Sequence, residues 1–151
     1  MGFVLYESGE HSCIAYNNLV RGDDGVQANQ FLIKHGTHSA VIDPGGSLLY
    51  TPLQLALGRY VRPHQIDLIL CSHQDPDVIG SVDKWLLYTQ AKVVCSRLWG
   101  RFVPHLVPHY MENAGSERYL LVEDEGARIP LGDADVLALP AHFMHSVGNL
   151  S

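Results

Sequence analysis

Apolar and polar residues alternate between strand-like and helix-like patterns along the whole chain, which predicts an α/β protein. Short runs rich in β-branched and aromatic residues predict strands. These runs are residues 3–6, 13–16, 30–34, 39–43, 66–70, 91–95, 119–123, 127–129 and 134–139. The last two are expected to continue the sheet that the earlier strands form.

Helical spacing of apolar residues marks two longer stretches, residues 47–61 and residues 78–90. A third, short helix is expected over residues 96–103. The apolar stripes consist of Leu49, Leu53, Leu57 and Val61 in the first helix, with Leu48 and Leu55 beside them, and of Val82, Trp85 and Leu86 in the second. One buried face on each helix predicts that both pack against the sheet.

Composition narrows the class of protein. A chain of 151 residues with 46% hydrophobic residues can bury one globular core. The net charge of −6 argues against a broad nucleic-acid surface. Three Cys without a Cys-x-x-Cys spacing argue against a disulfide scaffold or a zinc ribbon and favour a reduced, cytoplasmic setting. No stretch has the length of a membrane span, and the first residues do not form a signal peptide.

The most informative polar stretch directly follows the expected strand 66–70. His73, Asp75 and Asp77 alternate there, just before a helix. Residues two apart in extended backbone point the same way, and Pro76 keeps Asp75 out of the helical region. Three metal-ligating side chains can therefore converge at the carboxyl end of a strand, where sites form in layered α/β proteins.

A simpler explanation exists for each of these residues alone. Asp77 could cap the helix that begins at Val78, and Asp75 followed by proline could be turn chemistry. The three residues together, after a buried strand, favour the metal site.

This His-x-Asp-x-Asp arrangement resembles the metal motif of the metallo-β-lactamase fold. Asp75 places a carboxylate at the middle position of this motif. In that respect the sequence resembles the diiron branch of the fold, which comprises the flavodiiron proteins and related oxygen-binding diiron proteins. Hydrolases of the fold usually carry a second His at that position. Replacing His by a carboxylate moves a site from zinc toward a harder ion such as iron. The resemblance implies an αββα sandwich.

Two further stretches match the same family. His142 follows the expected strand 134–139, and Ser146 comes four residues later, as in the diiron proteins. His145 stands where the family often has an acidic residue, so its role is open; His142 itself could instead be a core histidine. Asp43 resembles the family's strand-end Asp, which orients the imidazole ligands. A plain β-turn is the alternative explanation for Asp43.

The sequence departs from the family in two ways. Val78 stands where the family has a His, which implies that the second of two iron sites lacks one nitrogen ligand. The family also places a bridging Asp and a final His beyond this point. Residues 1–151 are therefore expected to form one metallo-β-lactamase-like domain of the diiron type, truncated at its C-terminus. A homo-oligomer, or a further C-terminal segment or domain, would supply the rest.

The resemblance implies a non-haem diiron protein that binds O2 or another small diatomic ligand, as an oxygen sensor or an O2/NO reductase. His73, Asp75 and His142 would hold the first iron, and Asp77 would face the second. Whether the chain is an enzyme stays open, and no flavin is expected because no flavodoxin-like segment is present. The alternatives are a zinc-dependent hydrolase in which Asp77 orients the water, and a metal-free domain that serves in assembly.

The remaining histidines predict less. His105 and His109 are four residues apart, but Pro108 between them makes a shared helix face doubtful. They are expected at the rim of a pocket rather than on a metal. The sequence predicts that the following histidines are ordinary loop residues: His11, His35, His38 and His64.

Overall fold

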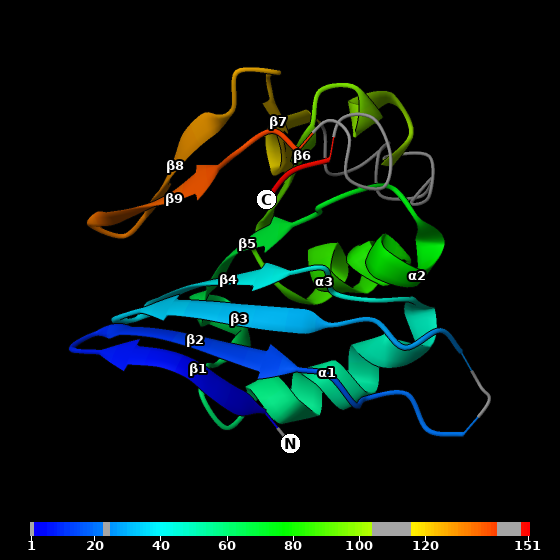
Figure 1. The fold of residues 1–151 in the computed structure, drawn as a ribbon, viewed down its shortest axis with the longest axis vertical. Helices are drawn as coiled ribbons and strands as arrows, with labels where there is room; N and C mark the ends of the chain where they lie inside the picture. Colours follow the sequence, from blue (N-terminus) through cyan, green and yellow to red (C-terminus); the bar gives the residue numbers. More distant parts are fainter. Residues whose placement is uncertain (1, 23–24, 104–115, 142–148) are drawn as a thin grey trace.

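The computed structural model describes residues 2–22, 25–103, 116–141 and 149–151. A seven-stranded mixed sheet runs through them, with the helices on one face and a two-stranded hairpin near the other (Figure 1). The strands of the large sheet lie in sequence order. Those strands are β1 (Phe3–Ser8), β2 (His11–Tyr16), β3 (Gln30–His35), β4 (His38–Ile42), β5 (Ile66–Leu70), β6 (Lys92–Ser96) and β7 (Tyr119–Val122).

The relative direction of neighbouring strands changes at β4, from antiparallel to parallel. Strands β1 to β4 pair antiparallel through hairpins, whereas β4, β5, β6 and β7 pair parallel through crossovers. Gly36 takes a positive φ of 56° in the β3–β4 turn, as expected for that hairpin. The predicted strands of this sheet are confirmed to within a few residues. Because β4 and β5 are parallel, their carboxyl ends meet at one edge of the sheet.

The hairpin of β8 (Ala127–Leu131) and β9 (Ala134–Ala138) corrects the sequence prediction. These strands form a sheet of their own instead of extending the large one. They contribute Ile129, Leu131 and Ala138 to a second core cluster with the large sheet's Ala40 and Leu68. Burial of that apolar face explains why the hairpin covers the sheet and does not lengthen it.

The first predicted helix begins with a 3-10 turn, η1 (Ser47–Leu49), and continues as α1 (Tyr50–Leu57). All four residues of the predicted stripe are buried, but the helix ends at Leu57, four residues earlier than predicted, so Val61 lies beyond it. The flanking Leu48 and Leu55 are 76% and 70% exposed. The short turn η2 (Pro63–Gln65) then leads into β5.

The second predicted helix is divided into α2 (Pro76–Ile79) and α3 (Val82–Tyr88). Ser81 is the reason for the break. Its N–H donates to the carbonyl of Gly45 at 3.0 Å, and its buried hydroxyl lies within hydrogen-bond distance of the Gly45 carbonyl at 2.8 Å and the Pro44 carbonyl at 3.1 Å. Because these partners lie far away in the sequence, the apolar spacing gave no sign of the break.

The third predicted helix, over residues 96–103, is wrong. The 3-10 turn η3 (Trp99–Arg101) lies there in place of an α-helix, and another, η5 (Ser116–Arg118), precedes β7. Gly100 lies in the middle of η3, where glycine weakens a helix. A side chain at that position would also collide with Leu121.

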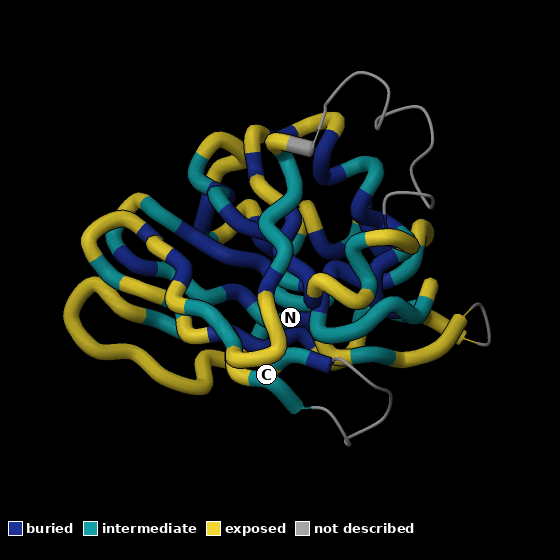
Figure 2. Tube along the Cα trace, turned by 90° about the horizontal axis from the view of Figure 1, so that it is seen from above, coloured by how far each residue is buried: buried dark blue, intermediate teal, exposed yellow. Residues whose placement is uncertain are grey.

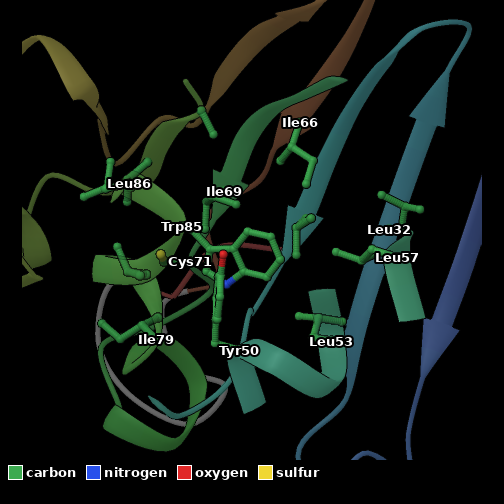
Figure 3. Close-up of a cluster of buried hydrophobic side chains, with 14 of the residues drawn as sticks. Leu32, Tyr50, Leu53, Leu57, Ile66, Ile69, Cys71, Ile79, Trp85 and Leu86 are labelled. Carbon is green, nitrogen blue, oxygen red and sulfur yellow. The ribbon is translucent and has the colours of Figure 1, made fainter. Parts of the chain in front are cut away.

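Two cores sit on the two faces of the sheet. The larger one lies under α1 and α3, where Tyr50 and Trp85 pack edge to face at 4.9 Å between ring centroids (Figure 3). Burial is concentrated in the central strands β4, β5 and β6, whereas the edge strand β1 is exposed along its whole length (Figure 2). In the described parts of the chain, no helix has the length and apolarity needed to cross a membrane.

Candidate metal centre

The turn after β5 places two of the expected ligands beside each other. His73 Nε2 lies 3.6 Å from Asp75 Oδ2. Asp75 has extended backbone angles, φ −64° and ψ 136°, as expected from the proline that follows it. The alternation argument from the sequence therefore holds for this pair.

Asp77 lies in a different setting. The chain turns helical at Pro76, so Asp77 belongs to the first turn of α2 and no longer continues the extended alternation. Its side chain borders a groove of about 920 Å³ beside α1, which neither His73 nor Asp75 lines. Among the described residues, no three His, Cys, Asp or Glu side chains gather closely enough to hold a metal ion.

Asp43, at the end of β4, reaches across to the same turn. Its carboxylate accepts two hydrogen bonds from Ser72, one from the backbone N–H at 2.8 Å and one from the hydroxyl at 2.7 Å. Its own N–H donates to the carbonyl of Leu70 at 2.8 Å. Asp43 takes a positive φ of 52°, which Asp tolerates better than most residues. Such backbone conformations gather at functional sites because the surrounding contacts hold them.

Burial raises the pKa of the Asp43 carboxyl above its ordinary value of 3.8. The two hydrogen bonds from Ser72 and the nearby His73 imidazole oppose that rise. Asp43 is therefore a partly buried carboxyl group whose ionised form is disfavoured by burial and partly restored by Ser72 and His73.

Ser72 joins the carboxylate to the imidazole. Its hydroxyl lies 2.8 Å from His73 Nδ1, so Asp43, Ser72 and His73 form a chain of hydrogen bonds. The sequence prediction missed Ser72. The available signal was its place directly before the expected ligand, beside an Asp that ends the neighbouring parallel strand.

The other expected ligand cannot be placed in the same way. His142, His145 and Ser146 lie outside the described residues, as do His105 and His109. The structure describes the residues on either side of His142, His145 and Ser146, namely Ala141 and Asn149. Ala141 N–H donates to the carbonyl of Asn149 at 2.8 Å, and Leu150 N–H donates to the carbonyl of Ser72 at 2.9 Å. The described chain on the C-terminal side thus contacts the turn that carries His73.

Val78 packs in the larger core cluster and is only 6% exposed. Its carbonyl accepts the N–H of Gly45 at 2.7 Å, which ties α2 to the end of β4. The side chain at the position where the family has a His therefore contributes to the hydrophobic core.

The donors at this edge suit a particular kind of metal. Imidazole and carboxylate groups favour ions such as iron over the soft ions that thiolates select. Cys71 and Cys95 lie nearby in the core. Burial raises the pKa of the Cys71 thiol well above its ordinary value and that of Cys95 to about 12. Burial therefore disfavours the thiolate form of both residues.

The opposite end of these strands corrects a further sequence prediction. His11, His35 and His38 lie in strands β2, β3 and β4, not in loops. The rings of His11 and His35 stack at 4.3 Å, and their strands pair at these two residues. His35 Nε2 hydrogen-bonds Asp133 in the β8–β9 turn, and His38 Nδ1 lies 3.2 Å from Asp67 Oδ2.

Comparison with known proteins identifies the family. The model of the family described as ODP family beta lactamase matches residues 26–151. The chain belongs to this family. Two structures of the chemotaxis sensor ODP are similar to it: the apo state from T. denticola, with 36% identity and a TM-score of 0.80, and a peroxy diiron species, with 34% identity and a TM-score of 0.81. Each match covers 99% of this chain and 57% of the sensor chain.

More distant proteins extend the comparison. A curated relative, the putative diflavin flavoprotein A 4 from Synechocystis sp., is 32% identical over 89 residues, which is 58% of this chain and 15% of the relative. The metallo-beta-lactamase SMB-1 shares the fold, with 16% identity and a TM-score of 0.68, over 99% of this chain and 56% of that one. The predicted metallo-β-lactamase-like α/β fold is confirmed. This chain spans little more than half the length of the similar sensor.

Proposed function

We propose that the carboxyl edge of β4 and β5 forms part of a non-haem diiron centre that binds O2. The observation that carries the proposal is the His73–Asp75 pair, in which a carboxylate stands where hydrolases of the fold usually have a second His. Family membership supports it, because a similar structure is that of a diiron chemotaxis sensor. Oxygen sensing is the leading role, and O2 or NO reduction is the alternative within the same chemistry.

Each ligand has a stated role in this proposal. His73, Asp75 and His142 would hold the first iron, and Asp77, in the first turn of α2, would face the second. Asp43 orients the imidazole of His73, while Ser146 and His145 act as outer partners. Iron bound there would supply open coordination positions and electrons for a diatomic ligand.

We also propose that residues 1–151 are one part of a larger metal-binding unit. The similar sensor chains are matched over 57% of their length. The ligands that complete the second iron site would therefore come from a continuation of the chain or from another subunit.

The test begins with protein purified without oxygen. Elemental analysis should find iron bound in preference to zinc after incubation with equal amounts of both ions. Addition of O2 to the Fe(II)-loaded protein should produce a visible charge-transfer band, absent from the His73→Ala variant. Tightly bound zinc, no band with O2, and turnover of ester or phosphodiester substrates would contradict the proposal and favour a metallohydrolase.

A further inference from the structure

The hydroxyl of Ser72 has two neighbours but only one proton to give. Its oxygen lies 2.7 Å from Asp43 Oδ2 and 2.8 Å from His73 Nδ1. Both distances fit strong hydrogen bonds. Since a hydroxyl donates one hydrogen bond and accepts others, the position of its proton decides which nitrogen of His73 carries a hydrogen.

The carboxylate decides between the two possibilities. Ionised Asp43 can only accept, and it accepts from both the N–H and the O–H of Ser72. With its proton committed to Asp43, the Ser72 oxygen can only accept from His73. The hydrogen of the neutral imidazole must then be on Nδ1.

We infer that Ser72 is a positioning residue that holds the proton of His73 at Nδ1 and so makes Nε2 the metal-binding nitrogen. The part that concerns the metal rests on the proposed function, whereas the part that concerns the proton does not. Nε2 is the nitrogen that lies 3.6 Å from Asp75 Oδ2. The two lone-pair donors thus face each other at a separation that admits an ion about 2 Å from each.

The position of the strands explains why a serine is needed. Ligating histidines commonly donate their second N–H directly to a carboxylate. Here Asp43 ends β4, and each of its two oxygens accepts one hydrogen bond from Ser72, from the backbone N–H and from the hydroxyl. The hydroxyl therefore carries the orienting effect from one strand end to the next. The Ser72 carbonyl accepts from Leu150, so the backbone on both sides of this side chain is held.

The imidazole tautomer can be measured directly in the full chain without metal. Histidine ¹⁵N NMR at about pH 8.5, roughly two units above the ordinary histidine pKa, reports which nitrogen is protonated. The His73 signals are assigned by their loss in His73→Gln. Wild-type protein should show Nδ1–H, and Ser72→Ala should shift His73 toward Nε2–H. Ser72→Thr keeps a hydroxyl and should restore the wild-type spectrum.

Ser47→Ala is a matched control. Ser47 donates to the carbonyl of Gly80 at 2.8 Å, at the end of α2 remote from Asp75. This variant should leave the His73 tautomer unchanged. An Nε2–H tautomer in wild type, or the same tautomer in wild type and Ser72→Ala, would overturn the inference.

Iron affinity separates this inference from the proposed function. Ser72→Ala should weaken Fe(II) binding roughly 10- to 100-fold, and Ser72→Thr should recover most of the loss. If the tautomer changes as described but wild type does not bind Fe(II), the proposed function fails and the role of Ser72 in placing the proton stands. If Ser72→Ala binds Fe(II) as tightly as wild type does, the positioning role toward the metal is wrong.

Discussion

Imidazoles and carboxylates meet at both ends of β4, with different results. At the amino end, His38 contacts Asp67 directly, and His35 on the adjoining strand contacts Asp133 in the β8–β9 turn. A Cβ added to Gly132 would collide with the His38 ring, so the tip of the hairpin packs closely on it. These contacts use the imidazoles to join one element of the fold to another.

At the carboxyl end, a serine separates the two groups. Asp43 binds Ser72, and Ser72 contacts Nδ1 of His73, while Nε2 faces Asp75. The comparison shows that an imidazole beside a carboxylate does not by itself indicate a metal site. What distinguishes the carboxyl end is that one ring nitrogen is held by the protein and the other faces a second potential ligand.

Replacing one imidazole at each end of β4 should give the largest difference in iron binding between the two ends. His73→Ala should lose tight iron binding, with an effect larger than the roughly 10- to 100-fold expected for an outer partner. His142→Ala should behave in the same way. His38→Ala, the control at the other end, should bind as wild type does. Iron content after anaerobic loading and gel filtration measures this, and unchanged iron in both His73→Ala and His142→Ala would remove the site.

Asp43→Asn should give the next largest effect. Asn has the same shape and also tolerates a positive φ, so the backbone conformation should survive. The lost negative charge weakens the orientation of His73, and Fe(II) affinity should fall roughly 10- to 100-fold. Anaerobic Fe(II) titration measures the change. Wild-type affinity in this variant would show that the carboxylate is only part of a turn.

Val78 should make the two irons unequal. With no nitrogen ligand at this position, the second iron should be lost first during dialysis, and the iron bound by His73 and Asp75 last. The number of irons per chain followed over time measures this. Simultaneous loss of both ions would show that another residue completes the second site.

The Val78→His variant tests whether a side chain at this position can reach the second iron. The helix propensities of Val and His are similar, but the Val78 side chain is buried in the core. Burial of the introduced imidazole should cost about 1–3 kcal/mol in the metal-free protein, measured by denaturant unfolding. Recovery of that loss on Fe(II) addition would show that the imidazole turns to the metal, and no recovery would show that it stays in the core.

The smallest expected effect is on the pH dependence of stability. The pKa values of Asp43 and Asp133 shift in opposite directions. Burial raises the pKa of Asp43, so the folded state holds its proton more tightly, and this group makes stability fall as pH rises through the raised pKa. The hydrogen bond from His35 lowers the pKa of Asp133, so its contribution is present above the ordinary Asp pKa and is lost as pH falls through the lowered one.

Unfolding of the metal-free protein between about pH 3 and pH 6 tests this contrast. Relative to wild type, Asp43→Asn should gain stability as pH rises, and Asp133→Asn should lose it. Parallel pH profiles for the two variants would show that the two carboxylates do not differ in the way described.

The sequence predicted those parts of the site that depend on local chemistry. The apolar run of β5 and the proline after Asp75 were sufficient to place His73 and Asp75 on one turn. Ser72 was missed because its role depends on Asp43, 29 residues away, and becomes visible only when the ends of β4 and β5 are paired. Asp77 was grouped with the pair because the onset of α2 at Pro76 is not visible in a two-residue alternation.

Long-range contacts also explain the other differences. The helix break at Ser81 depends on Gly45, and the separate β8–β9 sheet depends on burial against the opposite face of the large sheet. The histidines at the amino end resembled loop residues because strand ends and loops share polar composition. Their partners, Asp67 and Asp133, come from other elements.

The most direct test of the account is the position of iron itself. Anomalous X-ray diffraction at the iron edge, from anaerobically Fe(II)-loaded crystals, locates the ion without reference to any variant. The account predicts the strongest peak between His73 Nε2 and Asp75. A peak beside His11, His35 and His38, or iron bound with no peak at the carboxyl end of β5, would contradict it.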